Sequence, residues 1–318
     1  MNTYNNYLEE VTLSEFFFAV VAKDLSPRVR VTTWAGYEKA YNSRIAPILG
    51  YQRLADISPL DIRSWQSGLI SQGYSESYQI QLNSLLSRTF DLAVRFYDLP
   101  ENPCVLAGRI GRTGQSQRAD IWTLNEFWKV YDHIPDPSIR TQVAFIFWTG
   151  LRKGELYGLK WEDFDRSRGE IRIVRSYQRH DGRGLLLPPK TARGKRIISL
   201  PLHQCEALEM HYRNQNCPSP NDHIFKWTKR KLEDGIAEAC ARSGVKRIRV
   251  HDIRHSHASL LIRMNADIAA ISQRLGHSSI TMTLNVYAHT YDRADRTIAN
   301  QLDSVADRSD AELSDYYS

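Results

Sequence analysis

An arginine and a glutamate in the middle of the chain are spaced so that both lie on one face of a helix. Arg152 follows the apolar run that ends at Gly150, and Glu155 lies three residues later, on the same face of a helix. An arginine held by a carboxylate can present its planar guanidinium group to a phosphate. A structural Arg–Glu ion pair is the alternative, because fixed pairs of this kind are common in proteins.

A second polar cluster follows about a hundred residues later, in the segment H-D-I-R-H. His251 and Arg254 are three residues apart and share one helical face. His251 and His255 are four residues apart, which is also the spacing of two metal ligands on a helix. However, Asp252 stands where a zinc protease of the H-E-x-x-H type would have its general-base glutamate. Metal chemistry therefore remains the second interpretation of this cluster.

Three further polar residues lie outside these two clusters. Lys190 lies near the tip of an expected hairpin, where its ammonium group is either solvated or able to donate a proton to a leaving oxygen. His277 follows Gly276, a residue that can end a helix. Tyr287 lies near the end of the next expected helix, where a tyrosine is by default a packing residue with a solvated hydroxyl group.

Taken together and in order, these segments resemble the tyrosine recombinases, also called phage-type integrases. The shared elements are T-G-L-R-x-x-E-L, a hairpin lysine, H-x-x-R, L-G-H, and a tyrosine ten residues after that histidine. The resemblance implies that Tyr287 attacks a DNA phosphate. It implies that the residues surrounding this phosphate are Arg152, Lys190, His251, Arg254 and His277.

The resemblance also implies a role for each residue. The two arginines neutralise the non-bridging oxygens, where one preorganised donor is typically worth on the order of 100- to 1000-fold in rate. A free tyrosine has a pKa of about 10, so it requires a base, and His251 takes that role. His277 donates a hydrogen bond to an oxygen, and Lys190 protonates the departing 5′ hydroxyl. We expect no metal, cofactor or ATP, because the cationic cluster replaces a metal and the 3′-phosphotyrosyl bond conserves the energy of the ester.

The wording of the motifs indicates a subgroup of recombinases. The phrases W-T-G-L-R-K-G-E-L, P-K-T and L-G-H-S-S-I-T-M-T-L are similar to those in integrases of prophages and integrative conjugative elements. We therefore expect site-specific integration and excision of a mobile element, with a chromosome- or plasmid-dimer resolvase of the same family as the alternative. More distant alternatives are a type IB topoisomerase-like enzyme, a DNA-binding regulator, and a zinc hydrolase using His251, His255 and His277.

The elements that position these residues fall into two domains. Residues 1–108 are expected to form a helical core-site DNA-binding domain. Its helices are expected over 13–24, from Thr32 or Thr33, from Pro59 with Ser58 as its cap, and over 80–96. Residues 109–119 are glycine-containing and basic, which is typical of a flexible linker. Many integrases of mobile elements carry an additional arm-site-binding domain, and only a short segment precedes the first expected helix here.

Residues 120–292 are expected to form the catalytic domain. Its helices are predicted over 142–150, 229–243, 251–264, 267–275 and 281–289. The alternation of Ile171, Ile173 and Val174 with arginines predicts a strand over 170–177. The stretches 185–188 and 195–200 are predicted to pair as a hairpin around Thr191–Gly194. The expected fold class is mainly α with a small antiparallel β-sheet (α+β).

Charge is unevenly distributed along the 318 residues. The net charge is +6, made up of +1 in residues 1–118, +9 in 119–287 and −4 in 288–318. The basic middle block favours double-stranded DNA as a partner, held in a two-domain clamp, although a basic surface also serves solubility.

The acidic end of the chain is expected to form a tail helix over 293–318. Its apolar positions are Ile298, Leu302 and Val305, which form one stripe that requires a partner surface. The resemblance implies packing on a neighbouring subunit in a DNA-bound tetramer, with docking on its own domain as the alternative. It also implies accessory DNA-bending or directionality factors as partners.

Two absences in the sequence bear on location. No apolar run approaches the ~20 residues of a membrane span. The four cysteines lie far apart, which fits a reducing compartment better than a disulfide framework. We therefore expect a soluble cytoplasmic protein without a membrane partner, associated with the nucleoid when bound to DNA.

Overall fold

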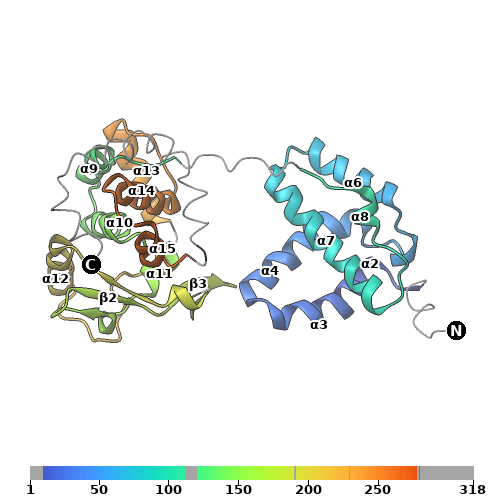
Figure 1. The fold of residues 1–318 in the computed structure, drawn as a ribbon, viewed down its shortest axis with the longest axis horizontal. Helices are drawn as coiled ribbons and strands as arrows, with labels where there is room; N and C mark the ends of the chain where they lie inside the picture. The colour runs from blue at the N-terminus through green and yellow to red at the C-terminus, as the bar shows by residue number, and fades with distance from the viewer. Residues whose placement is uncertain (1–9, 112–119, 190, 229, 278, 280–318) are drawn as a thin grey trace, which may run out of the picture. The chain divides into compact units, whose positions relative to one another are not determined.

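The computed structural model describes residues 10–111, 120–189, 191–228, 230–277 and 279. The chain divides into two compact units, Met1–Gln115 and Ser116–Ser318, and each has its own hydrophobic core. Most described elements are helices, joined by short antiparallel strands in the second unit (Figure 1). The expected fold class is therefore confirmed. No helix of the described residues is long and apolar enough to cross a membrane.

The described part of the first unit is helical. Its elements are α2 (Leu13–Phe16), η1 (Phe17–Val21), α3 (Ala22–Leu25), η2 (Ser26–Arg28), α4 (Val31–Ala40), η3 (Tyr41–Ile45), α5 (Ala46–Leu49), η4 (Leu54–Asp56), α6 (Pro59–Ser71), α7 (Glu76–Phe96) and α8 (Pro103–Ala107).

Local sequence explains where these helices begin. Thr12 and Ser58 cap α2 and α6 in reciprocal capping boxes, and Pro59 occupies the first turn of α6 as predicted. The second expected helix begins at Val31 rather than at a threonine, with Arg30 as its N-cap. In the core, the ring of Phe17 stacks on that of Tyr41 with 3.7 Å between centroids, which fixes the first helical segment against η3.

The second unit contains helices and two small antiparallel sheets. The helical elements are α9 (Leu124–Asp132), α10 (Pro137–Thr149), α11 (Lys153–Gly158), η5 (Trp161–Asp163), η6 (Ala192–Gly194), α12 (Leu202–Asn214), α13 (Lys231–Ser243), α14 (Val250–Arg263) and α15 (Ile268–Leu275). The strands are β1 (Phe164–Asp165), β2 (Glu170–Ile173), β3 (Ser176–His180), β4 (Arg183–Leu187) and β5 (Arg196–Ser199). Helix α12 was not predicted, because its thirteen residues contribute only Gln204 and Leu208 to the buried interior.

The predicted hairpin between 185–188 and 195–200 is wrong. Strand β5 pairs with β2 in the sheet β1-β2-β5, with Ile198 opposite Ile171, whereas β4 pairs with β3 in a separate two-stranded sheet. The expected single strand over 170–177 is likewise divided between the two sheets. The decisive signal is Asp181-Gly182, where both residues have positive φ and join β3 to β4. A D-G pair between two strands strongly favours a tight hairpin turn. The chain therefore pairs β4 with β3 across this turn and not with β5 across the longer connection that follows β4.

Candidate active site

Arg152, the first predicted site residue, lies in the short turn between α10 and α11. Helix α10 ends at Gly150, whose φ of 68° is left-handed. A Cβ added there would lie 2.6 Å from side-chain carbons of both His257 and Leu275, so only glycine fits this crossing. Two residues later, Arg152 is the N-cap of α11. The short turn therefore carries Arg152 away from the buried helix and leaves its side chain 36% exposed.

Glu155 is the buried carboxylate that holds this arginine. It is 3% exposed and accepts hydrogen bonds from the backbone N–H of Arg152 at 3.1 Å and from Arg152 Nη1 at 2.8 Å. It also accepts from Arg196 Nη2 at 2.9 Å. Burial alone would raise the pKa of the Glu155 carboxyl, but the hydrogen bond and charge of Arg196, followed by the charges of Arg152 and Arg254, hold it below 4.5. Glu155 is therefore ionised at neutral pH.

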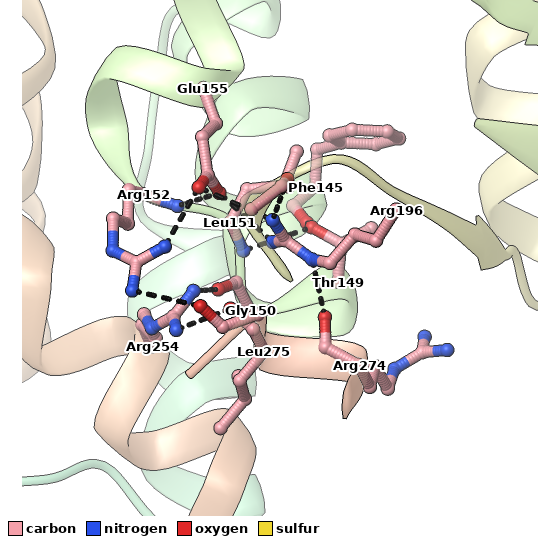
Figure 2. A network of polar contacts seen from close by, with 12 residues as sticks. Phe145, Thr149, Gly150, Leu151, Arg152, Glu155, Arg196, Arg254, Arg274 and Leu275 are labelled. Atoms are coloured by element: carbon pink, nitrogen blue, oxygen red, sulfur yellow. Dashed lines mark hydrogen bonds and ion pairs between the residues drawn. The ribbon is translucent and has the colours of Figure 1, made fainter. Parts of the chain in front are cut away.

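Arg254 connects three segments of the site from inside. It is 2% exposed on α14, with Nη1 donating to the Gly150 carbonyl at 2.7 Å and Nη2 to the Leu275 carbonyl at 2.6 Å. Figure 2 shows its guanidinium group between these two carbonyls, close to Arg152. Because both carbonyls end helices, one side chain fixes the turn before Arg152 and the turn before His277.

The two predicted histidines lie beside these arginines. His251 is in the first turn of α14, and the residue as a whole is exposed. Partial burial of its ring, followed by the charges of His255, Arg254 and Arg152, lowers its pKa to about 4. Burial, followed by the charges of Arg254 and Arg152, also lowers the pKa of His277 to about 4. Both rings are therefore neutral at pH 7, and a neutral imidazole can accept a proton or a hydrogen bond.

The charges of Arg152 and Arg254 act on both His251 and His277, so four of the six predicted site residues form one electropositive cluster, called the pocket from here on. Arg152 Nη2 lies 3.5 Å from the carbonyl of Gly276, the residue before His277. Arg254 donates to the carbonyl of Leu275, the residue before Gly276, and to that of Gly150, two residues before Arg152. The pocket combines fixed cations with uncharged bases, a composition that suits a phosphodiester anion and proton transfer at its oxygens. Lys190 and Tyr287 lie outside the described residues, as do 112–119 of the expected linker and the expected tail helix.

The ligand set of the zinc alternative does not form in this pocket. The rings of His251 and His255 meet edge to face with 5.2 Å between centroids. Among the described residues, however, no three His, Cys, Asp or Glu side chains are grouped so that they could hold a metal ion. His251, His255 and His277 therefore do not form a metal-binding group.

Two arginines of the site network were missed from the sequence. Arg196 is the first residue of β5 and contacts Glu155, and Arg274 donates to the Ser199 and Trp148 carbonyls, both at 3.2 Å. The available signal was the strand period of two, which places Arg196 on the same face as Ile198, a residue only 1% exposed. A charged residue on the buried face of a strand requires a partner inside the domain.

Buried histidines make the stability of the protein sensitive to acid. Burial, followed by the charge of Arg274, lowers the pKa of His257 to about 3 from 6.5. Between pH 6.5 and about 3 the unfolded chain therefore binds a proton that the folded chain does not. The free energy of unfolding should therefore decrease as the pH is lowered through this window, by about 1.4 kcal/mol per pH unit for such a group. Replacing His257 by Gln should flatten the dependence of Tm on pH between 6.5 and 5.

The matched control for this measurement is His133→Gln, since His133 is exposed at the end of α9. This variant should keep the pH dependence of the unmodified chain. Parallel Tm curves for the His257 variant and the unmodified protein would contradict the assignment.

Both units of the chain contain residues that match known protein families. Residues 121–294 match the model of the Phage integrase family, and residues 12–70 match that of the Phage integrase, N-terminal SAM-like domain. The chain is 30% identical over 279 residues to the ICEBs1 integrase of Bacillus subtilis (strain 168), which covers 83% of this chain and 75% of that protein.

Solved structures share the fold. The Tn1549 transposon integrase in complex with transposon right end DNA aligns with a TM-score of 0.78 at 20% identity, covering 91% of this chain and 99% of that one. The lambda integrase tetramer bound to a Holliday junction aligns with a TM-score of 0.66 at 21% identity, covering 87% and 80%.

Proposed function

The chain belongs to the phage integrase family and is a tyrosine recombinase, and from this premise we propose how its residues cut and rejoin DNA. Its activity is site-specific DNA recombination of the integrase type, and the likeness to the ICEBs1 integrase supports integration and excision of a mobile element. One observation supports the assignment of residues: Arg152 at the start of α11, His251 and Arg254 on α14, and His277 after α15 lie close together.

In the proposed cleavage step, Tyr287 Oη attacks the scissile phosphorus and the bond from phosphorus to the 5′ oxygen breaks. His251 accepts the phenolic proton, and Lys190 donates a proton to the departing 5′ oxygen. Arg152 and Arg254 stabilise the charge on the non-bridging oxygens, and His277 donates a hydrogen bond to one of them. Attack by a 5′ hydroxyl of another strand reverses these steps, so religation needs neither metal nor ATP.

The proposed partner is double-stranded DNA carrying the recombination site. Residues 1–108 bind the core site, 109–119 form a linker, and 120–292 cleave, so that the chain closes on the duplex as a clamp. Support comes from the +9 charge of residues 119–287 and from the Tn1549 integrase of the same fold, which was solved with DNA. The reaction then takes place in the cytoplasm, on DNA of the nucleoid.

The proposed active assembly is a DNA-bound tetramer in which residues 293–318 pack on a neighbouring subunit. The −4 charge of residues 288–318 disfavours DNA and favours a basic protein surface as the partner of this tail. The lambda integrase of the same fold was solved as a tetramer on a Holliday junction. Accessory DNA-bending or directionality factors would act on the same assembly.

Selection from a random duplex library tests this function. The bound sequences should define one site, and the protein should become covalently attached to that site through a 3′ phosphate. A DNA-binding regulator would select a site without forming the adduct, and a topoisomerase would relax supercoiled DNA that lacks the site. Either result would overturn the assignment.

The same site tests the clamp and the tail. Residues 119–318 alone should bind it far more weakly than the full chain, and binding by the full chain should weaken steeply with salt. Residues 1–292 should bind a single site normally but fail to assemble two sites into a synaptic complex. Equal affinity of 119–318 and the full chain would contradict the clamp, and normal synapsis by 1–292 would contradict the role of the tail.

A further inference from the structure

Arg196 is an arginine with a buried side chain, and each of its three nitrogens donates to a protein acceptor close to the pocket. Its side chain is 5% exposed at the start of β5. Nη2 donates to Glu155 Oε2 at 2.9 Å, and Nη1 to Glu155 Oε1 at 3.3 Å and to the Gly194 carbonyl at 3.2 Å. Nε donates to the Arg274 carbonyl at 2.7 Å. One side chain therefore joins β5 to α11 and to the last turn of α15 (Figure 2).

The contact with Glu155 determines how that carboxylate meets Arg152. Both oxygens of Glu155 already accept from Arg196. Arg152 also donates to this carboxylate, from its backbone N–H to Oε2 and from its Nη1 to Oε1. The Nη2 of Arg152 is directed instead toward the Gly276 carbonyl, 3.5 Å away. An arginine alone with a carboxylate prefers a two-bond, fork-to-fork pair. By occupying the carboxylate, Arg196 prevents Arg152 from closing on Glu155 in that way.

The contact with α15 acts on the other side of the pocket. Arg274 precedes the left-handed turn at Gly276 that ends α15 and leads to His277. Gly276 is packed so closely against Arg196 that an added Cβ would lie 3.0 Å from its Nη1. The position of the His277 segment therefore depends on the same guanidinium group that holds Glu155.

Building on the proposed function, we infer that Arg196 is a positioning residue for DNA cleavage. It holds Glu155 so that Arg152 is restrained at one nitrogen and presents its remaining edge to the scissile phosphate. It also holds the turn that carries His277. Arg196 itself does not touch DNA, since its side chain is buried and directed into the protein.

Replacing Arg196 by Met should slow cleavage while leaving DNA binding nearly unchanged. Without its first partner, Glu155 should draw Arg152 into the two-bond pair and away from the phosphate. We expect the single-turnover rate of adduct formation at saturating protein to fall about 100-fold, as for loss of a preorganised donor. The Kd for the selected site should change less than about threefold. Arg172→Met is the matched control, because Arg172 is exposed on the neighbouring strand β2 and donates to the Glu162 carbonyl.

Two further variants separate positioning from loss of folding. Arg196→Lys keeps the charge but not the fork, so its rate should lie between those of the unmodified chain and Arg196→Met. If Arg196 acts through Glu155, the double variant Glu155→Gln/Arg196→Met should lose less rate than the product of the two single losses and should approach the rate of Arg196→Met alone. Independent, multiplying losses would overturn the inference.

A substrate without phosphate charge gives a readout that a purely structural defect would not change. When a methylphosphonate replaces the scissile phosphate, the positive charge presented by Arg152 matters less. The rate gap between the unmodified chain and Arg196→Met should then shrink, whereas partial unfolding would preserve it. If the unmodified chain forms no adduct on any selected site, the proposed function itself fails. If it forms the adduct and Arg196→Met matches its rate, only the role of Arg196 fails.

Discussion

Replacing Tyr287 by Phe should abolish covalent attachment to DNA, the largest effect expected for any single substitution in this chain. Only the nucleophilic oxygen is removed, so the affinity for the selected site should stay within a few-fold of that of the unmodified chain. Denaturing gel electrophoresis with a suicide substrate, in which the cleaved strand cannot be religated, measures the adduct directly. Because the four pocket residues are unchanged, loss of the adduct with retained binding would identify Tyr287 as the nucleophile.

Tyr291 provides the matched control for this experiment, since it lies four residues further along the same segment. Tyr291→Phe should form the adduct at the normal rate. An adduct that persists in Tyr287→Phe and disappears in Tyr291→Phe would transfer the nucleophilic role to Tyr291.

Replacing Arg254 by Met should reduce both cleavage and stability. The side chain donates to the carbonyls of Gly150 and Leu275, and both acceptors would be left unpaired in the interior. An unpaired buried polar group costs about 1–3 kcal/mol, so Tm should fall measurably. Loss of the charge should also slow adduct formation by about 100- to 1000-fold in the protein that remains folded.

Arg254→Lys separates the two effects. A lysine keeps the positive charge that acts on His251 and His277, but its single ammonium group cannot reproduce the fork between two carbonyls. Compared with Arg254→Met, Arg254→Lys should regain more of the rate of adduct formation than of the Tm. The control is Arg263→Met, at an exposed position on the same helix. A normal cleavage rate in folded Arg254→Met would contradict the role of Arg254 in the pocket.

Residues with local determinants were predictable from the sequence. The cap at Ser58 and the glycine that ends α10 follow from backbone requirements within a few residues. The motif residues Arg152, His251, Arg254 and His277 were named from their spacing and from the family resemblance, and the structure places them in one pocket. Their meeting depends on helices that are far apart in the chain.

Features decided by long-range pairing were not predicted, although short local signals bore on some of them. The partner of β5 is β2, because Ile198 completes the buried face that Ile171 and Ile173 begin. The leucines of β4 had a similar apolar character in the sequence, yet they pair with the half-exposed β3. Arg196 was missed for the same reason, since its carboxylate partner Glu155 lies 41 residues earlier in the chain.

The neutral histidines of the pocket make the strength of its base depend on the substrate. Burial and then neighbouring positive charges lower the pKa values of His251 and His277 in the free protein. A phosphodiester bound between Arg152 and Arg254 adds a negative charge, which offsets those cations and raises both pKa values. In the proposed mechanism, the acceptor for the Tyr287 proton is therefore a weaker base when the pocket is empty and a stronger base when DNA is bound. In that mechanism the DNA phosphate therefore takes part in activating the tyrosine that attacks it.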